Sequence, residues 1–260
     1  MIVLIPCDPL DQKQADEPFQ SEHRVLKSSN VRCSLFDFDA LAFGEFKPKP
    51  ELKSEDLVLY RGWMLNPNSY KSLVKMVHKT GAKMITSTKE YVLSHHLPCW
   101  YQSCKDLTPE TVFLSVEADI VFESEKLNWR KYFVKDYVKS NYDERGSIAN
   151  SPSEVAEIVN RIKEHRGDIE GGIALRKVEQ FRQETETRYF VLGNKIYSPN
   201  ASIPSIVEEI SKRHRAPFYS VDIIVNFEGV HRLIEIGDGQ VSDKKTWNTD
   251  AFCNLIAENA

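Results

Sequence analysis

Two acidic residues in the C-terminal part of the chain lie inside strongly apolar runs. Asp222 lies within residues 219–225 and Glu235 within residues 231–236, and residues 226–229 between them are typical of a turn. A carboxylate inside an apolar strand is costly unless it binds a cation or a partner. Mg²⁺ prefers one or two carboxylates together with phosphate oxygens. If the two strands pair around the turn, both acids could hold one Mg²⁺; the alternative is that each faces solvent at a strand end.

A lysine ends another apolar run. Residues 131–135 are predicted to form a strand that ends in Lys135, and a loop rich in Ser, Asn, Asp and Gly follows at residues 140–151. A lysine supplies a point charge for a phosphate, and a polar loop supplies backbone N–H groups. The pattern therefore indicates phosphate binding, although a lysine is also common at solvent-facing strand ends.

A third charged segment lies between these two features. Residues 176–181 (RKVEQF) end an apolar strand, and residues 184–191 (ETETRYFV) follow. By composition alone this segment would be a charged connector between two lobes. Its interest comes from its place in the order, after the strand-borne lysine and before the two acids.

The elements that must position these residues fall into two kinds. The N-terminal part alternates strands with helices: strands are predicted at 2–6, 31–36, 57–60 and 82–86, with a helix that begins at residues 66–68 and ends at Gly81. This alternation predicts a small parallel α/β lobe. The last third predicts an antiparallel sheet from 173–178, 188–192, 219–225 and 231–236, with a tight turn at Gly193 and Asn194, a helix over 204–214 and a closing helix over 249–257.

Short helices at 89–95 and 100–107 are predicted between these two parts. A longer helix begins at Ser151, with a carboxylate in its first turn, and ends at Gly167. Its apolar positions recur at helical spacing: Val155, Ile158, Val159 and Ile162.

In this order the elements resemble the ATP-grasp family. The strand-borne lysine, loop, helix, Glu-x-Phe segment, second Glu, Asp and final Glu follow the family's order over residues 87–243, and the separation of Asp222 from Glu235 is also similar. Residues 61–63, 135–140 and 186–191 more specifically resemble a divergent branch of phage and bacterial proteins. That branch is related to the eukaryotic cell-division-cycle chaperone that assembles a translation initiation factor.

The resemblance implies an α/β (α+β) fold of the ATP-grasp type. A small N-terminal parallel α/β lobe would be followed by two lobes that grip ATP, the last with an antiparallel sheet. The expected domains are residues 1–86, 87–178 and 179–260.

The resemblance also implies ATP and Mg²⁺ as cofactors and a role for each matching position. Lys135 would contact the α- and β-phosphates, and Lys139 with the loop around Ser147 would close over the triphosphate. The Glu-x-Phe segment would meet adenine, and Glu186 would hold the ribose. The implied nucleotide-binding residues are Lys135, Lys139, Ser147, Lys177, Glu179, Gln180, Phe181 and Glu186, and the implied metal ligands are Asp222, Glu235 and Asp238.

Two positions depart from the family pattern. The last metal ligand of the family is typically an Asn two residues after the Glu, but this chain has Gly237, so Asp238 or Gln240 would have to substitute. Many members carry an Arg two residues before the metal Asp, and this chain has Ser220. Arg188 is the candidate replacement that would stabilise the transferring phosphate.

Three functions are consistent with this pattern. The first is a carboxylate–amine ligase that acts through an acylphosphate, with Lys139 and Arg188 at the reacting phosphate. Arg61 is a candidate for binding the substrate carboxylate, unless it forms a surface salt bridge. The substrates would be a small-molecule, peptide or protein carboxylate and an amine. The second is a non-catalytic ATP-binding chaperone or interaction module with a protein partner, and the third is a small-molecule kinase.

Composition excludes other classes. The 260-residue chain has a formal net charge of −4, which argues against a nucleic-acid binder that works by neutralising phosphates. No apolar run reaches the roughly 18 residues that a membrane-spanning helix needs. We therefore expect a cytoplasmic protein without nucleic-acid or membrane partners.

Overall fold

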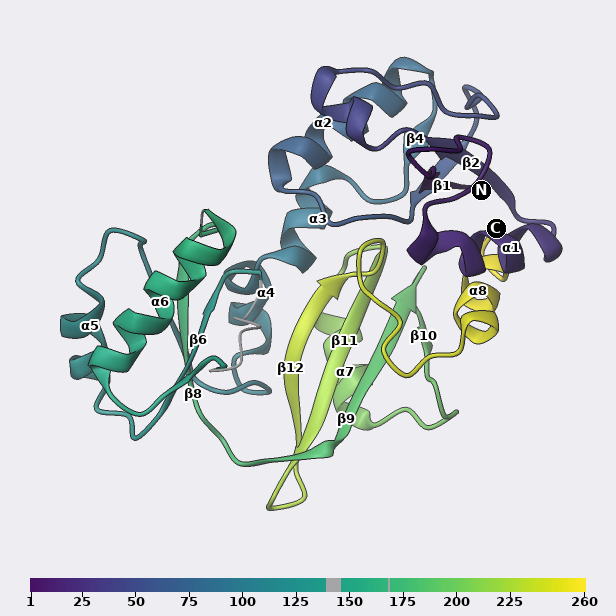
Figure 1. The fold of residues 1–260 in the computed structure, drawn as a ribbon. Coiled ribbons are helices and arrows are strands. Elements are labelled where there is room, and N and C mark those ends of the chain that lie inside the picture. The colour runs from purple at the N-terminus through teal and green to yellow at the C-terminus, as the bar shows by residue number, and fades with distance from the viewer. Residues whose placement is uncertain (139–145, 168) are drawn as a thin grey trace. The chain divides into compact units, whose positions relative to one another are not determined.

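The computed structural model describes residues 1–138, 146–167 and 169–260. The chain forms two compact units (Figure 1). Unit 1 consists of Met1–Ser94, Thr187–Val221 and Gly237–Ala260, and unit 2 of His95–Glu186 and Asp222–Ile236. The expected division into three consecutive domains stays a prediction.

Unit 1 contains a four-stranded parallel sheet. Its strands are β1 (Ile2–Pro6), β2 (Arg32–Phe36), β3 (Leu57–Tyr60) and β4 (Lys83–Met84), in the order β2-β1-β3-β4. Every residue of β1 is buried, as expected for a central strand of a parallel sheet with both faces covered. The predicted parallel α/β lobe is confirmed.

Helices of unit 1 are α1 (Gln20–Ser28), α2 (Pro67–Lys79), α3 (Thr88–His95), α7 (Ser205–Arg213) and α8 (Thr249–Ala257), with short 3₁₀ helices η1 (Glu17–Phe19) and η2 (Asp39–Phe43). Helix α2 begins where the sequence predicts, because the Asn66 side chain accepts a hydrogen bond from the Ser69 N–H at 2.9 Å. Its buried residues Tyr70, Leu73 and Val77 belong to the same apolar cluster as Leu4 and Tyr60 of the sheet. The sequence does not predict helix α1, which contacts α8.

Unit 2 contains a second four-stranded sheet, with strands β5 (Thr111–Leu114), β6 (Tyr132–Asp136), β7 (Ile148–Ala149) and β8 (Ile173–Lys177) in the order β5-β8-β6-β7. All three pairings are antiparallel. Helix α6 (Pro152–Arg166) packs its apolar stripe on one face, and α4 (Leu97–Cys104) and α5 (Ile120–Leu127) complete the unit. The prediction that β8 belongs to the C-terminal sheet is wrong, because its backbone pairs with β5 and β6.

The third sheet has the order β10-β9-β11-β12, with β9 (Phe181–Leu192), β10 (Lys195–Tyr197), β11 (Phe218–Asn226) and β12 (His231–Asp238). Strands β9, β11 and β12 each contain residues of both units. The tight turn at Gly193 and Asn194 is confirmed, since both residues have positive φ, 58° and 69°, as a type I′ hairpin turn requires. The turn before β12 is confirmed by a 3.0 Å hydrogen bond from the Gly229 N–H to the Asn226 carbonyl.

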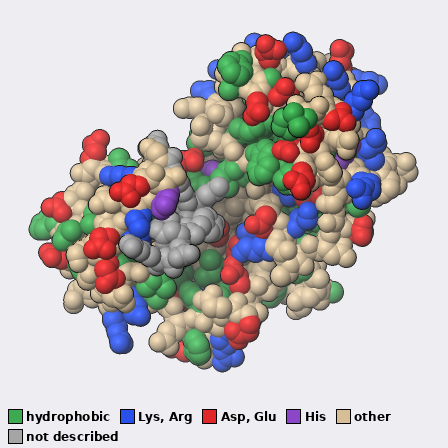
Figure 2. All heavy atoms as spheres, viewed as in Figure 1, with side chains coloured by type: hydrophobic (Ala, Val, Ile, Leu, Met, Phe, Trp, Pro, Cys, Tyr) green, Lys and Arg blue, Asp and Glu red, His purple; other side chains and the backbone are tan. Residues whose placement is uncertain are grey.

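Acidic and basic side chains are interspersed over the visible face (Figure 2). Among the described residues, no helix combines the length and the apolar character needed to cross a membrane. The fold is mixed α/β, as the sequence predicts.

Candidate functional site

An ion pair in unit 2 joins Lys135 of β6 to Glu235 of β12. The Lys135 Nζ donates to Glu235 Oε1 at 2.7 Å, across a sequence separation of 100 residues. Lys135 is 5% exposed, whereas the Glu235 side chain is 35% exposed. The structure therefore brings together the lysine and one of the acids that the sequence selected.

A second cation, Arg176 of β8, lies on the same face of its sheet as Lys135. Phe133 pairs with Arg176 and Lys135 with Ala174, and opposed or alternate residues of neighbouring strands share a face. The Arg176 Nη1 donates to the carbonyl of Ile234 at 2.7 Å, next to Glu235 in the chain. We call Lys135, Arg176 and Glu235 the cation cluster, because it combines two cations with one carboxylate.

Arg176 is poorly neutralised in this position. Its side chain is buried and its Nη2 has no hydrogen-bond partner in the part of the chain that the structure describes. Burial lowers the pKa of Arg176 to about 10, while the nearby Glu235 carboxylate opposes the shift. Even at that pKa the guanidinium is charged at neutral pH. The cation cluster therefore carries excess positive charge in a buried place, which suits an anionic ligand.

Lys177, the residue that the sequence selected at this position, points to the other face of the sheet. It pairs with Tyr132 in the register, and its Nζ lies 3.5 Å from Glu110 Oε2 with half of the side chain exposed. Strand alternation therefore separates Lys177 from the cation cluster and places Arg176 there instead. Because Ile173 and Leu175 pack toward α6, the same alternation could have selected Arg176 from the sequence.

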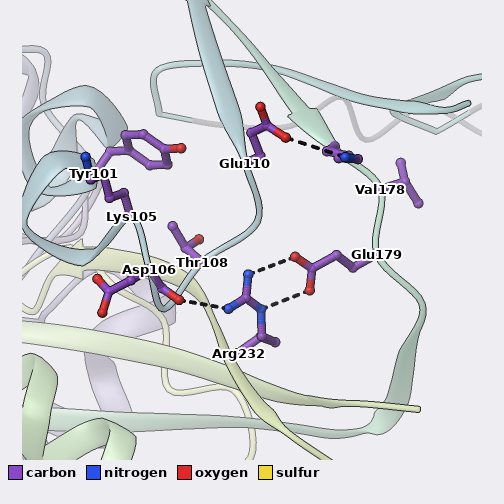
Figure 3. A pocket seen from close by; sticks show the side chains of 9 residues that line it. Tyr101, Lys105, Asp106, Thr108, Glu110, Val178, Glu179 and Arg232 are labelled. Atoms are coloured by element: carbon purple, nitrogen blue, oxygen red, sulfur yellow. Dashed lines mark hydrogen bonds and ion pairs between the residues drawn. The ribbon is translucent and has the colours of Figure 1, made fainter. Parts of the chain in front are cut away.

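Glu179 follows β8 and forms a two-bond ion pair with Arg232 of β12 (Figure 3). The Arg232 Nε donates to Glu179 Oε2 at 2.9 Å and its Nη2 to Oε1 at 2.8 Å, while its Nη1 donates to the Asp106 carbonyl at 3.1 Å. The pair borders a groove of about 650 Å³ within unit 2. The groove is lined by Tyr101, Lys105, Asp106, Thr108, Glu110, Lys177, Val178, Glu179 and Arg232.

Neighbouring Gln180 borders a second groove of unit 2, beside the β11–β12 turn. The Gln180 carbonyl accepts a hydrogen bond from the Phe227 N–H at 3.2 Å. Phe181 and Glu186 both lie on β9 and are partly exposed. Ser147 is buried beside β6, where its carbonyl accepts from the Val134 N–H at 2.8 Å. Lys139 lies outside the described residues.

The carboxylates proposed for metal binding do not form a group of three. Asp222 on β11 is 1% exposed and Asp238 is fully buried in unit 1. On β12, Glu235 and Asp238 are three residues apart, so their side chains point to opposite faces of the strand. No three His, Cys, Asp or Glu side chains come together as a metal-binding group within residues 1–138, 146–167 and 169–260. The structure therefore does not support Asp238 as the third ligand.

The sequence matches the model of an ATP-grasp domain family, family 3 of its clade, over residues 126–256, half of the chain. The chain belongs to this ATP-grasp family. The matched residues include the whole cation cluster, the Glu179–Arg232 pair and Asp222.

Several solved structures resemble the whole chain. D-cycloserine synthetase DcsG has a TM-score of 0.66 at 11% identity, covering 100% of this chain and 99% of that one. The macrocyclase MdnC of Microcystis aeruginosa, bound to precursor peptide MdnA, has a TM-score of 0.64 at 14% identity with both chains fully covered. The ATP-grasp ligase PsnB, complexed with a precursor variant, Mg and ADP, has a TM-score of 0.62 at 10% identity, covering 99% and 95%. At these identities the likeness shows a shared fold. No curated protein matches the sequence.

ATP-grasp enzymes use ATP and Mg²⁺, and the cation cluster fits the first of these. A buried ammonium is suited to phosphate oxygens, and so is a guanidinium whose Nη2 has no partner among the described residues. Asp222 and Glu235 offer two carboxylates, which is within the number that Mg²⁺ needs when phosphates and water supply the other oxygens. The residues present therefore fit both groups.

Gly237 stands where ATP-grasp proteins typically have an Asn ligand, and hydroxyl groups fill the space beside it. A Cβ at this position would lie 2.9 Å from the Ser220 Oγ and 3.0 Å from the Ser242 Oγ. These two hydroxyls are 2.8 Å apart, and the Ser242 Oγ donates to the Asp238 carbonyl at 2.8 Å. An Asn side chain would have to displace both serines. The departures at 220 and 237 are therefore parts of one packing arrangement.

Arg61 does not reach a substrate in this ATP-grasp chain. It is 3% exposed, and its Nε and Nη2 donate to the two carboxylate oxygens of Glu22 at 2.7 and 3.0 Å. Its Nη1 donates to the carbonyls of Gln240 and Ser242 at 3.1 and 2.6 Å. Lys244 also donates to Glu22, at 2.8 Å. The structure thus replaces both sequence-based alternatives for Arg61 with a buried ion pair that holds the segment after β12.

Arg188 is likewise bound to that segment. Its Nη1 donates to the carbonyl and to the Oδ1 of Asp243, both at 2.9 Å, and its side chain is 7% exposed. The indole N–H of Trp247 donates to the Arg188 carbonyl at 2.9 Å. A role for Arg188 at the reacting phosphate stays a prediction, and it would require exchange of the exposed Asp243 carboxylate.

The buried Asp238 carboxyl predicts a pH-dependent stability. Its Oδ1 accepts from the backbone and side-chain N–H groups of Gln240, both at 3.0 Å, and its Oδ2 has no partner in the described structure. Burial raises the pKa of Asp238 to about 7. The folded chain therefore holds this proton more tightly than the unfolded chain. The stabilisation is complete below about pH 4 and is lost as the pH rises through 7.

Asp238→Asn, which cannot ionise, is expected to remove this dependence. Between pH 5 and 8 the free energy of unfolding should fall by about 2 kcal/mol more in the wild type than in the variant. Urea unfolding at both pH values measures the difference, with the exposed Asp250→Asn as the control that keeps the wild-type behaviour. Equal pH dependence in the wild type and Asp238→Asn would contradict the assignment.

Proposed function

We propose that this chain is an ATP- and Mg²⁺-dependent ligase that joins a carboxylate to an amine and releases ADP and phosphate. The observation that carries the proposal is the cation cluster, in which two buried cations lie beside the carboxylate of Glu235 in a chain of the ATP-grasp family. The Arg176 Nη2 has no acceptor within the described part of the chain. Excess buried positive charge of this kind supports a polyanionic substrate, and the family indicates which one.

The chemistry follows from positioning and charge neutralisation. A substrate carboxylate oxygen attacks the γ-phosphorus of ATP, the bond to the ADP oxygen breaks, and an acylphosphate forms. An amine nitrogen then attacks the acyl carbon, phosphate leaves with its electron pair, and the nitrogen loses one proton as the amide forms. Lys135 and Arg176 would hold and neutralise phosphate oxygens, since fixed cations in a buried site stabilise developing charge without reorganisation.

Other residues have supporting roles in this proposal. Asp222 and Glu235 would hold Mg²⁺, which supplies charge neutralisation at the phosphates. Glu186 would bind the ribose, and the segment from Glu179 to Phe181 would border the base. Arg176 takes the place that the sequence suggested for Lys177, because only Arg176 of these two shares a face with Lys135.

The acceptor pair is to be found by experiment. Purified protein would be incubated with ATP, Mg²⁺ and pools of amino acids, small carboxylic acids and peptides. Peptides belong in the pool because MdnC and PsnB were each solved with a precursor peptide or minimal precursor. Release of ADP and phosphate, together with a product that is one water lighter than its two substrates in mass spectrometry, is expected. Tight ATP binding without turnover for any acceptor would refute a ligase.

A non-catalytic ATP-binding chaperone or interaction module is the second candidate. The packing of Ser220 and Ser242 against Gly237 favours it, because Gly237 supplies no side-chain oxygen at the family's usual ligand position. It would fit the branch related to the eukaryotic initiation-factor assembly chaperone. A pull-down with and without ATP that recovers one stoichiometric protein partner would support the module. A stable phosphorylated product with no amide would instead identify a kinase.

A further inference from the structure

Lys135 has two competing anionic partners if it binds phosphate. In the present structure its ammonium is 2.7 Å from Glu235, the residue that is also a candidate ligand for Mg²⁺. Lys135 is almost completely buried, so water cannot replace a lost carboxylate partner. The ammonium must therefore exchange one anion for another.

We propose that Glu235 is an internal competitor of the triphosphate. It neutralises Lys135 in the empty protein, and a divalent cation takes over its carboxylate when the nucleotide binds. ATP then binds tightly only together with the metal. This regulation of the nucleotide site rests on the proposed function.

The charges explain why the exchange needs the metal. Metal-free ATP would have to separate Lys135 from Glu235 and then lie beside the released carboxylate, where like charges repel. A divalent cation removes both penalties, since it neutralises Glu235 and bridges it to the phosphates. Each charge then keeps a partner of opposite sign throughout the exchange, which matters most in a site that is shielded from water.

Arg176 sets the lower limit of metal-free binding. Its Nη1 is held by the Ile234 carbonyl, and its Nη2, which has no partner among the described residues, can take an acceptor without breaking that contact. This guanidinium attracts phosphate whether or not metal is present. Metal-free ATP is therefore expected to bind weakly rather than not at all.

Titration calorimetry with ATP, in EDTA and in excess Mg²⁺, tests the proposal on the wild type and Glu235→Gln. The wild type should bind ATP at least about tenfold more weakly in EDTA, within the usual range for coupled sites. Glu235→Gln should bind metal-free ATP about tenfold more tightly than the wild type does, because Lys135 is already released. Mg²⁺ should then add little affinity.

A matched variant and a double-mutant cycle separate competition from a general charge effect. Asp222→Asn removes an equal charge from the neighbouring strand β11 but leaves the Lys135–Glu235 pair in place, so it should not tighten metal-free binding tenfold. In a Lys135→Gln background, Glu235→Gln should lose its gain in metal-free affinity. A gain of the same size in that background would overturn the proposal.

The outcomes also distinguish this proposal from the proposed function. Equal metal-free affinity of the wild type and Glu235→Gln would overturn internal competition and leave the ligase assignment standing. Failure of the wild type to bind any ATP in excess Mg²⁺ would overturn both. Circular dichroism melts of each variant, recorded before the titrations, show whether the protein compared is folded.

Discussion

Lys135→Met is expected to weaken ATP binding in the presence of Mg²⁺ by about a hundredfold, as is usual when one partner of a buried charge pair is truncated. Lys135 is 5% exposed on a strand of unit 2, so no solvent cation can take its place. Methionine keeps most of the side-chain volume, so the packing of β6 should be retained. The fold should tolerate the change, because the Glu235 carboxylate left behind is one-third exposed and can be hydrated.

Lys177→Met is the matched control, since it removes the same charge from the adjacent strand on the opposite face of the sheet. Titration calorimetry should give this variant an ATP affinity within about twofold of the wild type, as expected for a half-exposed lysine. If Lys177→Met and Lys135→Met lose affinity equally, the assignment of Lys135 to the nucleotide site is wrong. Lys135→Arg should retain part of the affinity because the charge remains.

Arg61→Met is expected to lower the free energy of unfolding by about 3 kcal/mol. The substitution leaves the Glu22 carboxylate, 1% exposed, with Lys244 as its charged partner, and it frees the carbonyls of Gln240 and Ser242. Burial raises the pKa of Glu22, but Arg61 and Lys244 more than offset this, so that the pKa is lowered overall. The ion pair therefore stabilises the fold above the pKa of an unfolded glutamate, and this stabilisation is lost as the pH falls through the lower folded value.

Urea unfolding at neutral pH measures this loss. Arg213→Met is the control, because its pair with Glu209 is a partly exposed contact within one helix and is worth only about 0.5 kcal/mol. Arg61→Lys should recover little, since an ammonium cannot form the two parallel bonds to Glu22 together with the two carbonyl contacts. A variant of normal stability that has lost turnover would instead restore Arg61 as a substrate-binding residue.

Several elements can be predicted because their signals are local. Strand β1 is a continuous apolar run, α2 begins at an Asn-Pro pair, and α6 has both a capping Ser151 and a terminating Gly167 with φ of 72°. Helix α1 has no such signal, because one of its few buried residues is Glu22, which adds nothing to an apolar pattern. Strand β5 has only four residues, and α5 follows it closely, so neither has a long periodic pattern.

Strand pairing is less accessible than strand existence. The sequence predicts residues 173–177 correctly as a strand but assigns them to the wrong sheet. An apolar run shows that a strand is buried, whereas its hydrogen-bonding neighbours come from segments that are distant in sequence. The pairing with β5 and β6 is therefore visible only in the folded chain.

The sequence by itself determined the order of the charged residues and the strands that carry them, which was enough to indicate an ATP-grasp chain. Tertiary structure decided which of these residues meet. Alternation along β8 and β12 places Arg176 rather than Lys177 beside Lys135, and Asp238 opposite to Glu235. The contact of Lys135 with Glu235 joins residues 100 positions apart. Such pairs depend on how separate sheets pack, because long-range electrostatic partners leave no periodic pattern along the chain.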